Sequence, residues 1–227
     1  MGQALAGVPT RPAYYPGAGE TYAAVVEAHP DARRFGDAPD GHLPWTLIPD
    51  VDPANADDLC FTREVFCGVL AETALDAGDT ATFVDRAVAF ANGTLWGTLN
   101  ATLLVHPASL RDRRVAVAVE RAIADLRYGT VLVNAAAFAG YYFQVTPWGG
   151  FPGHDPYAVQ SGLGKTANLL MFERPQKSVV RGPFRPGFDP IRVTTRRAHA
   201  FARRLAAFEA SRSLPRAAGL LWSALLA

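Results

Sequence analysis

The middle of the chain alternates short apolar runs with stretches in which apolar residues recur at helical spacing. The runs at 69–75, 98–105 and 130–133 have strand length, and Asp79 or Thr80 and then Ser109 are candidate N-caps for the helices between them. The predicted inward faces are Phe83, Val84, Ala87, Val88 and Ala91 in the first helix, and Val115, Val119, Ala122, Ile123 and Leu126 in the second. This β-α-β-α-β order favours parallel strands that are buried on both faces.

Simpler elements flank this region on its N-terminal side. Residues 1–19 are rich in proline and glycine, which disfavours regular structure, and residues 20–28 follow as a short helix with Val25 on its apolar side. Residues 43–49 form an apolar run bounded by prolines, which is typical of an edge strand. We therefore expect residues 1–42 to be an N-terminal arm with one short helix.

On the C-terminal side the pattern predicts a short helix over 164–171 and a strand over 176–180. A segment rich in proline and glycine follows, and residues 194–208 then have the spacing of a basic amphipathic helix. The predicted organisation is an α/β region over 43–182, with a parallel-sheet layer and flanking helices, followed by a helical extension over 183–227.

Composition narrows the classes of function. The 227 residues carry 22 basic and 21 acidic side chains and a net charge of +1, which predicts neither nucleic-acid nor membrane-surface binding. No apolar stretch approaches the roughly 20 residues that span a bilayer, and we expect a cytoplasmic protein. Cys60 and Cys67 are seven residues apart, a spacing unlike that of zinc or redox pairs, and we expect free thiols. The histidines are scattered, so the sequence predicts no metal site.

Several short motifs carry candidate chemistry. Glu64 and Phe66 stand in a turn-like stretch before the strand that begins at Val69, and a carboxylate there either is solvated, pairs with Arg63, or binds a ligand. The apolar strand at 130–133 ends in Asn134. The aromatic-rich residues 135–156, including Pro147-Trp148-Gly149-Gly150, either pack under a long loop or line a binding site.

In this order, the Glu-x-Phe, Val-Asn, Pro-aromatic-Gly-Gly and Lys-x-Val motifs resemble landmarks of the C-terminal half of an aldehyde dehydrogenase catalytic domain. The resemblance covers about residues 43–182 and implies that fold. It also implies that Glu64 accepts hydrogen bonds from the nicotinamide-ribose hydroxyls of NAD or NADP and that Phe66 lies against the nicotinamide ring. Phe138 and Trp148 would line the tunnel for the aldehyde substrate.

The chain departs from that family in two places. Cys67-Gly68 replaces the usual Gly-Pro, and Cys67 does not stand where the family has its nucleophile. A helical extension also follows Lys177-Ser178-Val179, where the family has an oligomerisation strand. Gly164-Lys165-Thr166 is not a phosphate-binding loop, because Val159 occupies the position of its required first glycine.

Two functional hypotheses follow. The first is an aldehyde dehydrogenase-family oxidoreductase represented by its C-terminal catalytic half, which is inactive alone and uses NAD or NADP only when a partner or an upstream segment completes it. The alternative is a non-catalytic interaction or oligomerisation protein derived from that fold. In both hypotheses the expected partner is a complementary chain or a second copy, with no nucleic acid and no membrane span.

Overall fold

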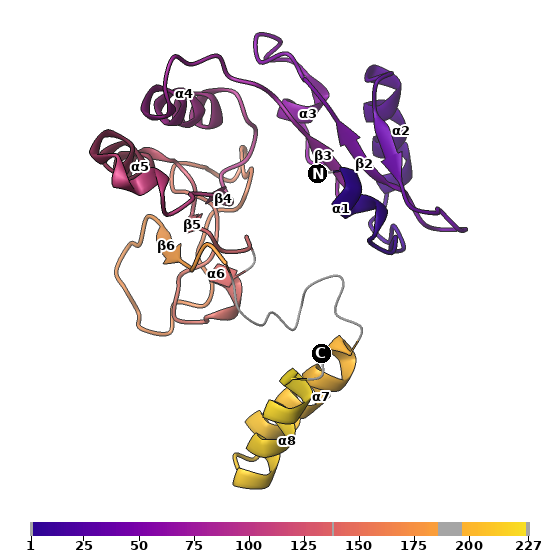
Figure 1. The fold of residues 1–227 in the computed structure, drawn as a ribbon, viewed down its shortest axis with the longest axis vertical. Coiled ribbons are helices and arrows are strands. Elements are labelled where there is room, and N and C mark those ends of the chain that lie inside the picture. Colours follow the sequence, from indigo (N-terminus) through magenta and orange to yellow (C-terminus); the bar gives the residue numbers. More distant parts are fainter. Residues whose placement is uncertain (1, 138, 186–196, 226–227) are drawn as a thin grey trace. The chain divides into compact units, whose positions relative to one another are not determined.

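The computed structural model describes residues 2–137, 139–185 and 197–225, and Figure 1 shows their elements. The chain forms two compact units. One unit contains residues 15–33 and 47–185, and the other contains residues 2–14, 34–46 and 197–225 of the described chain. The residues that carry the candidate chemistry belong to the first of these units.

A small parallel sheet organises the larger unit. Strands β4 (Asn100–Leu103), β5 (Thr130–Val133) and β6 (Ser178–Arg181) pair in that order, with Asn100 opposite Thr130 and Thr130 opposite Ser178. The central strand β5 is buried along its whole length. The predicted parallel pairing of the apolar strands is therefore confirmed for β4 and β5, and the fold is mixed α/β.

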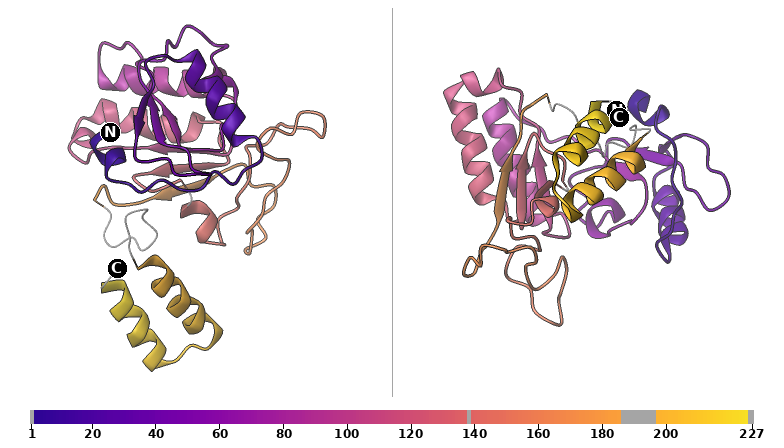
Figure 2. Two further views of the ribbon diagram at one scale, coloured as in Figure 1. Left: turned by 90° about the vertical axis from the view of Figure 1, so that its right-hand side faces the viewer. Right: turned by 90° about the horizontal axis from the view of Figure 1, so that it is seen from below.

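Two helices next to this sheet begin at aspartate N-caps. Helix α4 (Thr80–Gly93) begins after Asp79, whose carboxylate accepts a hydrogen bond from the Thr82 N–H group. Helix α5 (Arg113–Asp125) begins after Asp112, which accepts from Arg114 N–H in the same way. The prediction of Ser109 as this cap was wrong, because Ser109–Arg111 forms a separate 3-10 turn, η1, that ends before the helix starts. Figure 2 shows α4 and α5 side by side.

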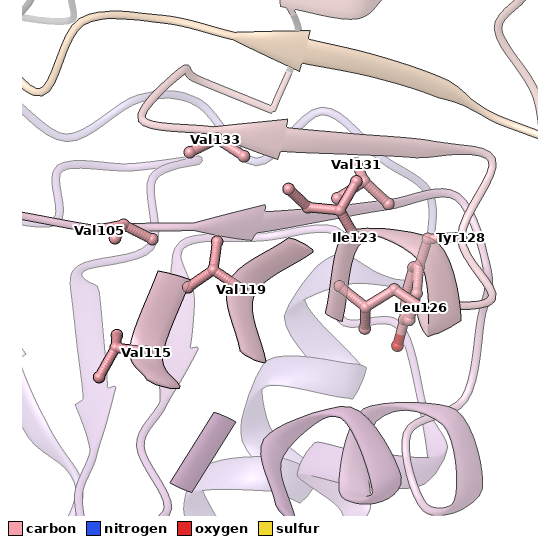
Figure 3. Packing of buried hydrophobic residues seen from close by; sticks show 8 residues of the cluster. All are labelled: Val105, Val115, Val119, Ile123, Leu126, Tyr128, Val131 and Val133. Carbon is pink, nitrogen blue, oxygen red and sulfur yellow. The ribbon is translucent and has the colours of Figure 1, made fainter. Parts of the chain in front are cut away.

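The hydrophobic core lies between α5 and the sheet (Figure 3). Its buried members are Val105, Val115, Val119, Ile123, Leu126, Tyr128, Val131 and Val133. The predicted inward face of α5 is confirmed, since all five of its residues are buried. Val84, Val88 and Ala91 of α4 pack against this cluster, whereas Phe83 is 45% exposed. Burial of this apolar area is the main source of stability for the α/β layer.

A second cluster in the same unit lies around α2 (Ala18–Ala28) and α3 (Leu59–Thr62). Its buried members are Val25, Ile48, Val51 and Phe61, and Phe90 of α4 packs edge-on against Phe61 with ring centroids 5.1 Å apart. Because α4 contributes to both clusters, it links the parallel layer to the segment that precedes β3 (Val69–Ala71).

Strands β1 (Arg33–Phe35), β2 (Trp45–Ile48) and β3 form a second three-stranded sheet in that order. The prediction of β2 as an edge strand was wrong, because β2 is central and three of its four residues are buried. The predicted strand 69–75 is shorter than expected. It also pairs outside the β4-β5-β6 sheet, so the β-α-β-α-β series is divided between two sheets.

In the smaller unit the N-terminal residues are more ordered than their composition suggests. Helix α1 spans Gly2–Ala6, and the Trp45 indole N–H group donates to the Val8 carbonyl at 3.1 Å. Helices α7 (Ala198–Ala210) and α8 (Leu214–Leu225) pack against each other, and Arg216 donates to the Ala207 carbonyl across the connection. No helix in the described part of the chain is long and apolar enough to cross a membrane.

Candidate functional site

The segment from Glu64 to Phe66 presents its charged and aromatic side chains to solvent. Glu64 is exposed and, among the described residues, has no hydrogen-bond or ion-pair partner. Phe66 is 58% exposed, and its φ of 46° lies in the left-handed region that bulky residues rarely adopt. Its ring lies 5.1 Å from that of Tyr15. Phe66 is therefore an exposed aromatic side chain on a strained backbone and is not part of a packed core.

The neighbouring elements hold this segment in place. Asp58 caps the short helix α3, Phe61 is buried, and the Trp96 N–H group donates to the Phe61 carbonyl at 2.7 Å. Val65 packs partly against the second cluster. Val65 is thus partly buried, whereas Glu64 and Phe66 on either side of it are exposed.

Asn134 ties the ends of β4 and β5 together. Its side-chain oxygen accepts from Val105 N–H at 2.8 Å, and its amide nitrogen donates to the Val105 carbonyl at 2.9 Å. Its φ of 54° is also left-handed, a conformation that asparagine tolerates better than most residues. The Val-Asn motif therefore serves the fold directly, by satisfying both backbone groups of Val105.

The Gly-Gly turn after Trp148 is held against the start of β5. A β-carbon on Gly129 would lie 1.7 Å from the Gly149 carbonyl oxygen, so the close approach of these two backbones requires glycine at position 129. The Lys165 ammonium donates to the carbonyls of Gly149 and Gly150, at 3.2 and 2.7 Å. Burial lowers the pKa of Lys165. Lys165 therefore acts as a backbone clamp, which is consistent with the absence of a phosphate-loop motif.

Trp148 is partly buried in an aromatic neighbourhood. Its backbone forms an antiparallel bridge with Thr166, and its ring meets that of Tyr141 edge-on at 5.9 Å. The ring also packs against Gly140 of α6 (Ala139–Tyr142), where a β-carbon would lie 3.3 Å from it. The predicted helix over 164–171 is wrong, because this stretch instead forms the bridge with Trp148 followed by turns. Phe138 lies outside the described residues.

A separate polar cleft of about 460 Å³ lies between the end of α4 and the loop after the Gly-Gly turn. Thr98 and His154 line it, the Thr98 hydroxyl is 2.9 Å from His154 Nε2, and the Thr98 N–H group donates to the Ser161 hydroxyl at 2.7 Å. Thr62 also lines the cleft, but Glu64, Phe66 and Trp148 do not. Sequence reasoning missed this cleft because Thr98 is more than 50 positions from its partners His154 and Ser161.

Neither cysteine is prepared to act as a nucleophile. Burial, together with the negative charge of Asp58, raises the pKa of Cys60 to about 12, and burial raises the pKa of Cys67. Both thiols are free. Because the thiolate is the reactive form, a raised pKa opposes thiol chemistry at neutral pH.

No protein-family model matches this chain, and no curated protein sequence matches it significantly.

Proposed function

We propose that this chain provides the nicotinamide-facing and aldehyde-facing elements of an aldehyde dehydrogenase-type oxidoreductase, which oxidises an aldehyde to the acid with NAD or NADP. The observation that carries the proposal is the outward pair Glu64 and Phe66, with Phe66 on a left-handed backbone. A carboxylate with no partner among the described residues is a natural acceptor for two ribose hydroxyls. An exposed aromatic ring two residues later is suited to stack on a nicotinamide.

The surrounding fold is compatible with this role. Asn134 fixes the carboxyl ends of β4 and β5, where ligands bind in many open parallel sheets. Trp148 precedes a clamped Gly-Gly turn and contacts exposed Tyr141, which supports an aromatic wall for a small apolar substrate. In this proposal Phe66 faces the cofactor and Trp148 faces the aldehyde, as the motif order implies; Phe138 is the second proposed tunnel residue.

The chain does not supply the nucleophile in this proposal. Aldehyde oxidation through a thiohemiacetal needs a thiolate. Cys60 and Cys67 are the two cysteines of the sequence, and both have raised pKa values. We therefore propose that a complementary polypeptide carries the reactive cysteine and the dinucleotide-binding fold, and that the isolated chain is inactive.

The cofactor contact is testable on the isolated chain with nicotinamide mononucleotide, which contains the nicotinamide ribose but not the adenosine half. Saturation-transfer NMR detects such weak binding. We expect transfer to the nicotinamide protons, with affinity reduced about tenfold in Glu64→Ala because a charge-assisted hydrogen bond is lost. Phe66→Ala should also weaken it. Glu72→Ala, which removes another exposed carboxylate of the same unit, is the matched control and should bind normally.

Binding that is equal in the Glu64→Ala, Phe66→Ala and Glu72→Ala variants would refute the assigned cofactor contact. Enzyme-like formation of NADH or NADPH from aldehyde by the isolated chain would refute the need for a complementary polypeptide. The first result tests the cofactor contact, and the second tests whether aldehyde oxidation needs another polypeptide.

A specific surface feature favours the alternative, a non-catalytic interaction or oligomerisation protein. Leu169, Leu170, Met171 and Phe172 are consecutive and are each between 53% and 86% exposed. Contiguous exposed apolar side chains mark interaction surfaces in soluble proteins. Light scattering should then show a stable assembly that Met171→Lys dissociates, whereas a monomer at working concentration would exclude this function.

A further inference from the structure

A cluster of metal-binding groups lies at the junction of α2 and α3, away from the cleft described above. His29 is the C-cap residue of α2, and Asp58 and Cys60 stand at the first turn of α3. One ligand atom from each of these three residues lies within 4.8 Å of the other two. The fold thus brings together a nitrogen, an oxygen and a sulfur ligand from positions about 30 residues apart.

We propose that His29, Asp58 and Cys60 form a binding site for a zinc-class transition-metal ion, with water as the fourth ligand. The distances fit this geometry. His29 Nε2 lies 3.2 Å from Asp58 Oδ2 and 3.8 Å from Cys60 Sγ. A tetrahedral zinc centre with ordinary bond lengths has N–O and N–S edges of roughly 3.4 and 3.6 Å. Small side-chain rotations therefore complete the site.

The environment of His29 orients the ring for coordination through Nε2. Its Nδ1 atom lies 2.7 Å from the Val25 carbonyl, which can only accept, so Nδ1 is the donor of this bond and Nε2 is the nitrogen that faces Asp58 and Cys60. A backbone carbonyl on the other ring nitrogen is the usual outer-shell partner of a metal-ligating histidine. Val25 is fully buried, which holds that carbonyl in place.

Asp58 is oriented in a similar way. Its Oδ1 atom accepts from Cys60 N–H at 2.8 Å, and this bond leaves Oδ2 directed at His29. The side chains of His29 and Asp58 are each 13% exposed, so the site is partly desolvated but open to an incoming ion and to water. Three protein ligands with one open position are typical of zinc sites that retain a bound water.

The ligand types decide the class of metal. Calcium and magnesium take oxygen ligands, whereas thiolate and imidazole favour zinc and neighbouring transition metals. Binding displaces the Cys60 thiol proton to the buffer, and the resulting thiolate and the Asp58 carboxylate neutralise the divalent charge. The bound ion would join the end of α2 to the helix that precedes Glu64 and Phe66.

Cobalt(II) is a suitable optical probe because it occupies zinc sites and reports thiolate coordination. Titration of the purified, reduced protein should produce a thiolate-to-cobalt charge-transfer band and strong visible bands of four-coordinate cobalt, saturating at one ion per chain. Added zinc should abolish both. Zinc should also raise the thermal unfolding temperature, because it binds the folded state.

Matched variants test the ligand set. Cys60→Ser should lose the charge-transfer band, whereas Cys67→Ser, which removes the other thiol, should retain it. His29→Ala should weaken cobalt binding by more than the roughly 100-fold that loss of an outer-shell partner costs. His106→Ala is the control for removal of an exposed histidine. Circular dichroism checks that each variant is folded.

Three results would overturn the site. The first is absence of the band in folded wild-type protein, which would leave only a histidine–aspartate ion pair. The second is retention of the band in Cys60→Ser or its loss in Cys67→Ser. The third is a zinc coordination shell of nitrogen and oxygen alone in zinc-edge X-ray absorption of the wild-type protein, because the proposed site requires a sulfur ligand. This measurement tests the site even if Cys60→Ser does not fold. None of these results depends on dehydrogenase activity.

Discussion

Replacing Asn134 tests whether the Val-Asn motif serves the fold in the way that its contacts indicate. The side chain makes two hydrogen bonds to the backbone of Val105, a residue that is 9% exposed, and the residue itself is left-handed. Asn134→Ala removes both bonds and places a less tolerant residue at positive φ. Asn134→Gly removes the same bonds but adopts that backbone freely.

The magnitudes follow from these contacts. Each lost side-chain hydrogen bond contributes about 1 kcal/mol, and an unpaired backbone group at buried Val105 adds a desolvation cost of similar size. Alanine in the left-handed region costs about 1 kcal/mol more than glycine there. We expect a loss of about 4 kcal/mol for Asn134→Ala and about 3 kcal/mol for Asn134→Gly.

Urea unfolding followed by circular dichroism measures these losses. With a typical dependence on urea, the midpoint should fall by about 1–2 M for Asn134→Ala and by less for Asn134→Gly. The reasoning is refuted if Asn134→Ala is within about 0.5 kcal/mol of the wild type, or if glycine is the more damaging replacement. Val179→Ala, at a 42% exposed position on β6, is a control for nonspecific effects in the same sheet.

Three further predictions concern other features of the same unit. The hydrogen bond from Thr82 N–H lowers the pKa of Asp79, so its capping contribution should be present above the usual value of 3.8 and be lost as pH falls through the folded value. Asp79→Ala should therefore lower the urea midpoint at neutral pH but not in acid, whereas Asp79→Asn should keep the cap at both; equal Asp79→Ala effects at both pH values would contradict this. Gly129→Ala should lower the free energy of unfolding in urea by more than about 3 kcal/mol, because its β-carbon meets a backbone carbonyl. Gly164→Ala is the control and should be nearly neutral, because there is open space around Gly164. Similar stabilities of the two variants would show that the close approach at Gly129 does not require glycine. Because the pKa of Cys60 is about 12, its thiolate fraction at neutral pH is about 1000-fold below that of an ordinary thiol. Cys60 of the metal-free protein should therefore be alkylated slowly, which mass spectrometry measures. An alkylation rate equal to that of the unfolded chain would contradict the burial of this thiol.

Local patterns predicted the elements whose own residues determine them. The apolar spacing of α5 identified its buried face, and Asp79 was one of the two candidate caps for α4, because periodicity and capping depend on residues within one or two turns. The parallel pairing of β4 and β5 also followed from the order of short apolar runs and amphipathic helices along the chain.

The wrong predictions involved competition between distant parts of the chain. Proline-bounded β2 looked like an edge strand, but its neighbours on both sides are strands whose pairing no local pattern reveals. The stretch at 164–171 was predicted as a helix, yet Thr166 instead pairs with Trp148, because a backbone bridge formed in tertiary context overrides weak helical propensity.

The sequence by itself determined the α/β class, the inward face of α5 and the exposed character expected of Glu64, because these depend on composition and short-range spacing. Only the tertiary structure placed His29 beside Asp58 and Cys60, and Thr98 beside His154. Ligand groups in such clusters come from segments that are joined by packing rather than by sequence proximity, so a search for closely spaced histidines and cysteines could not find them. Chain folding brings these polar atoms together because burying the apolar residues around them fixes where each segment lies.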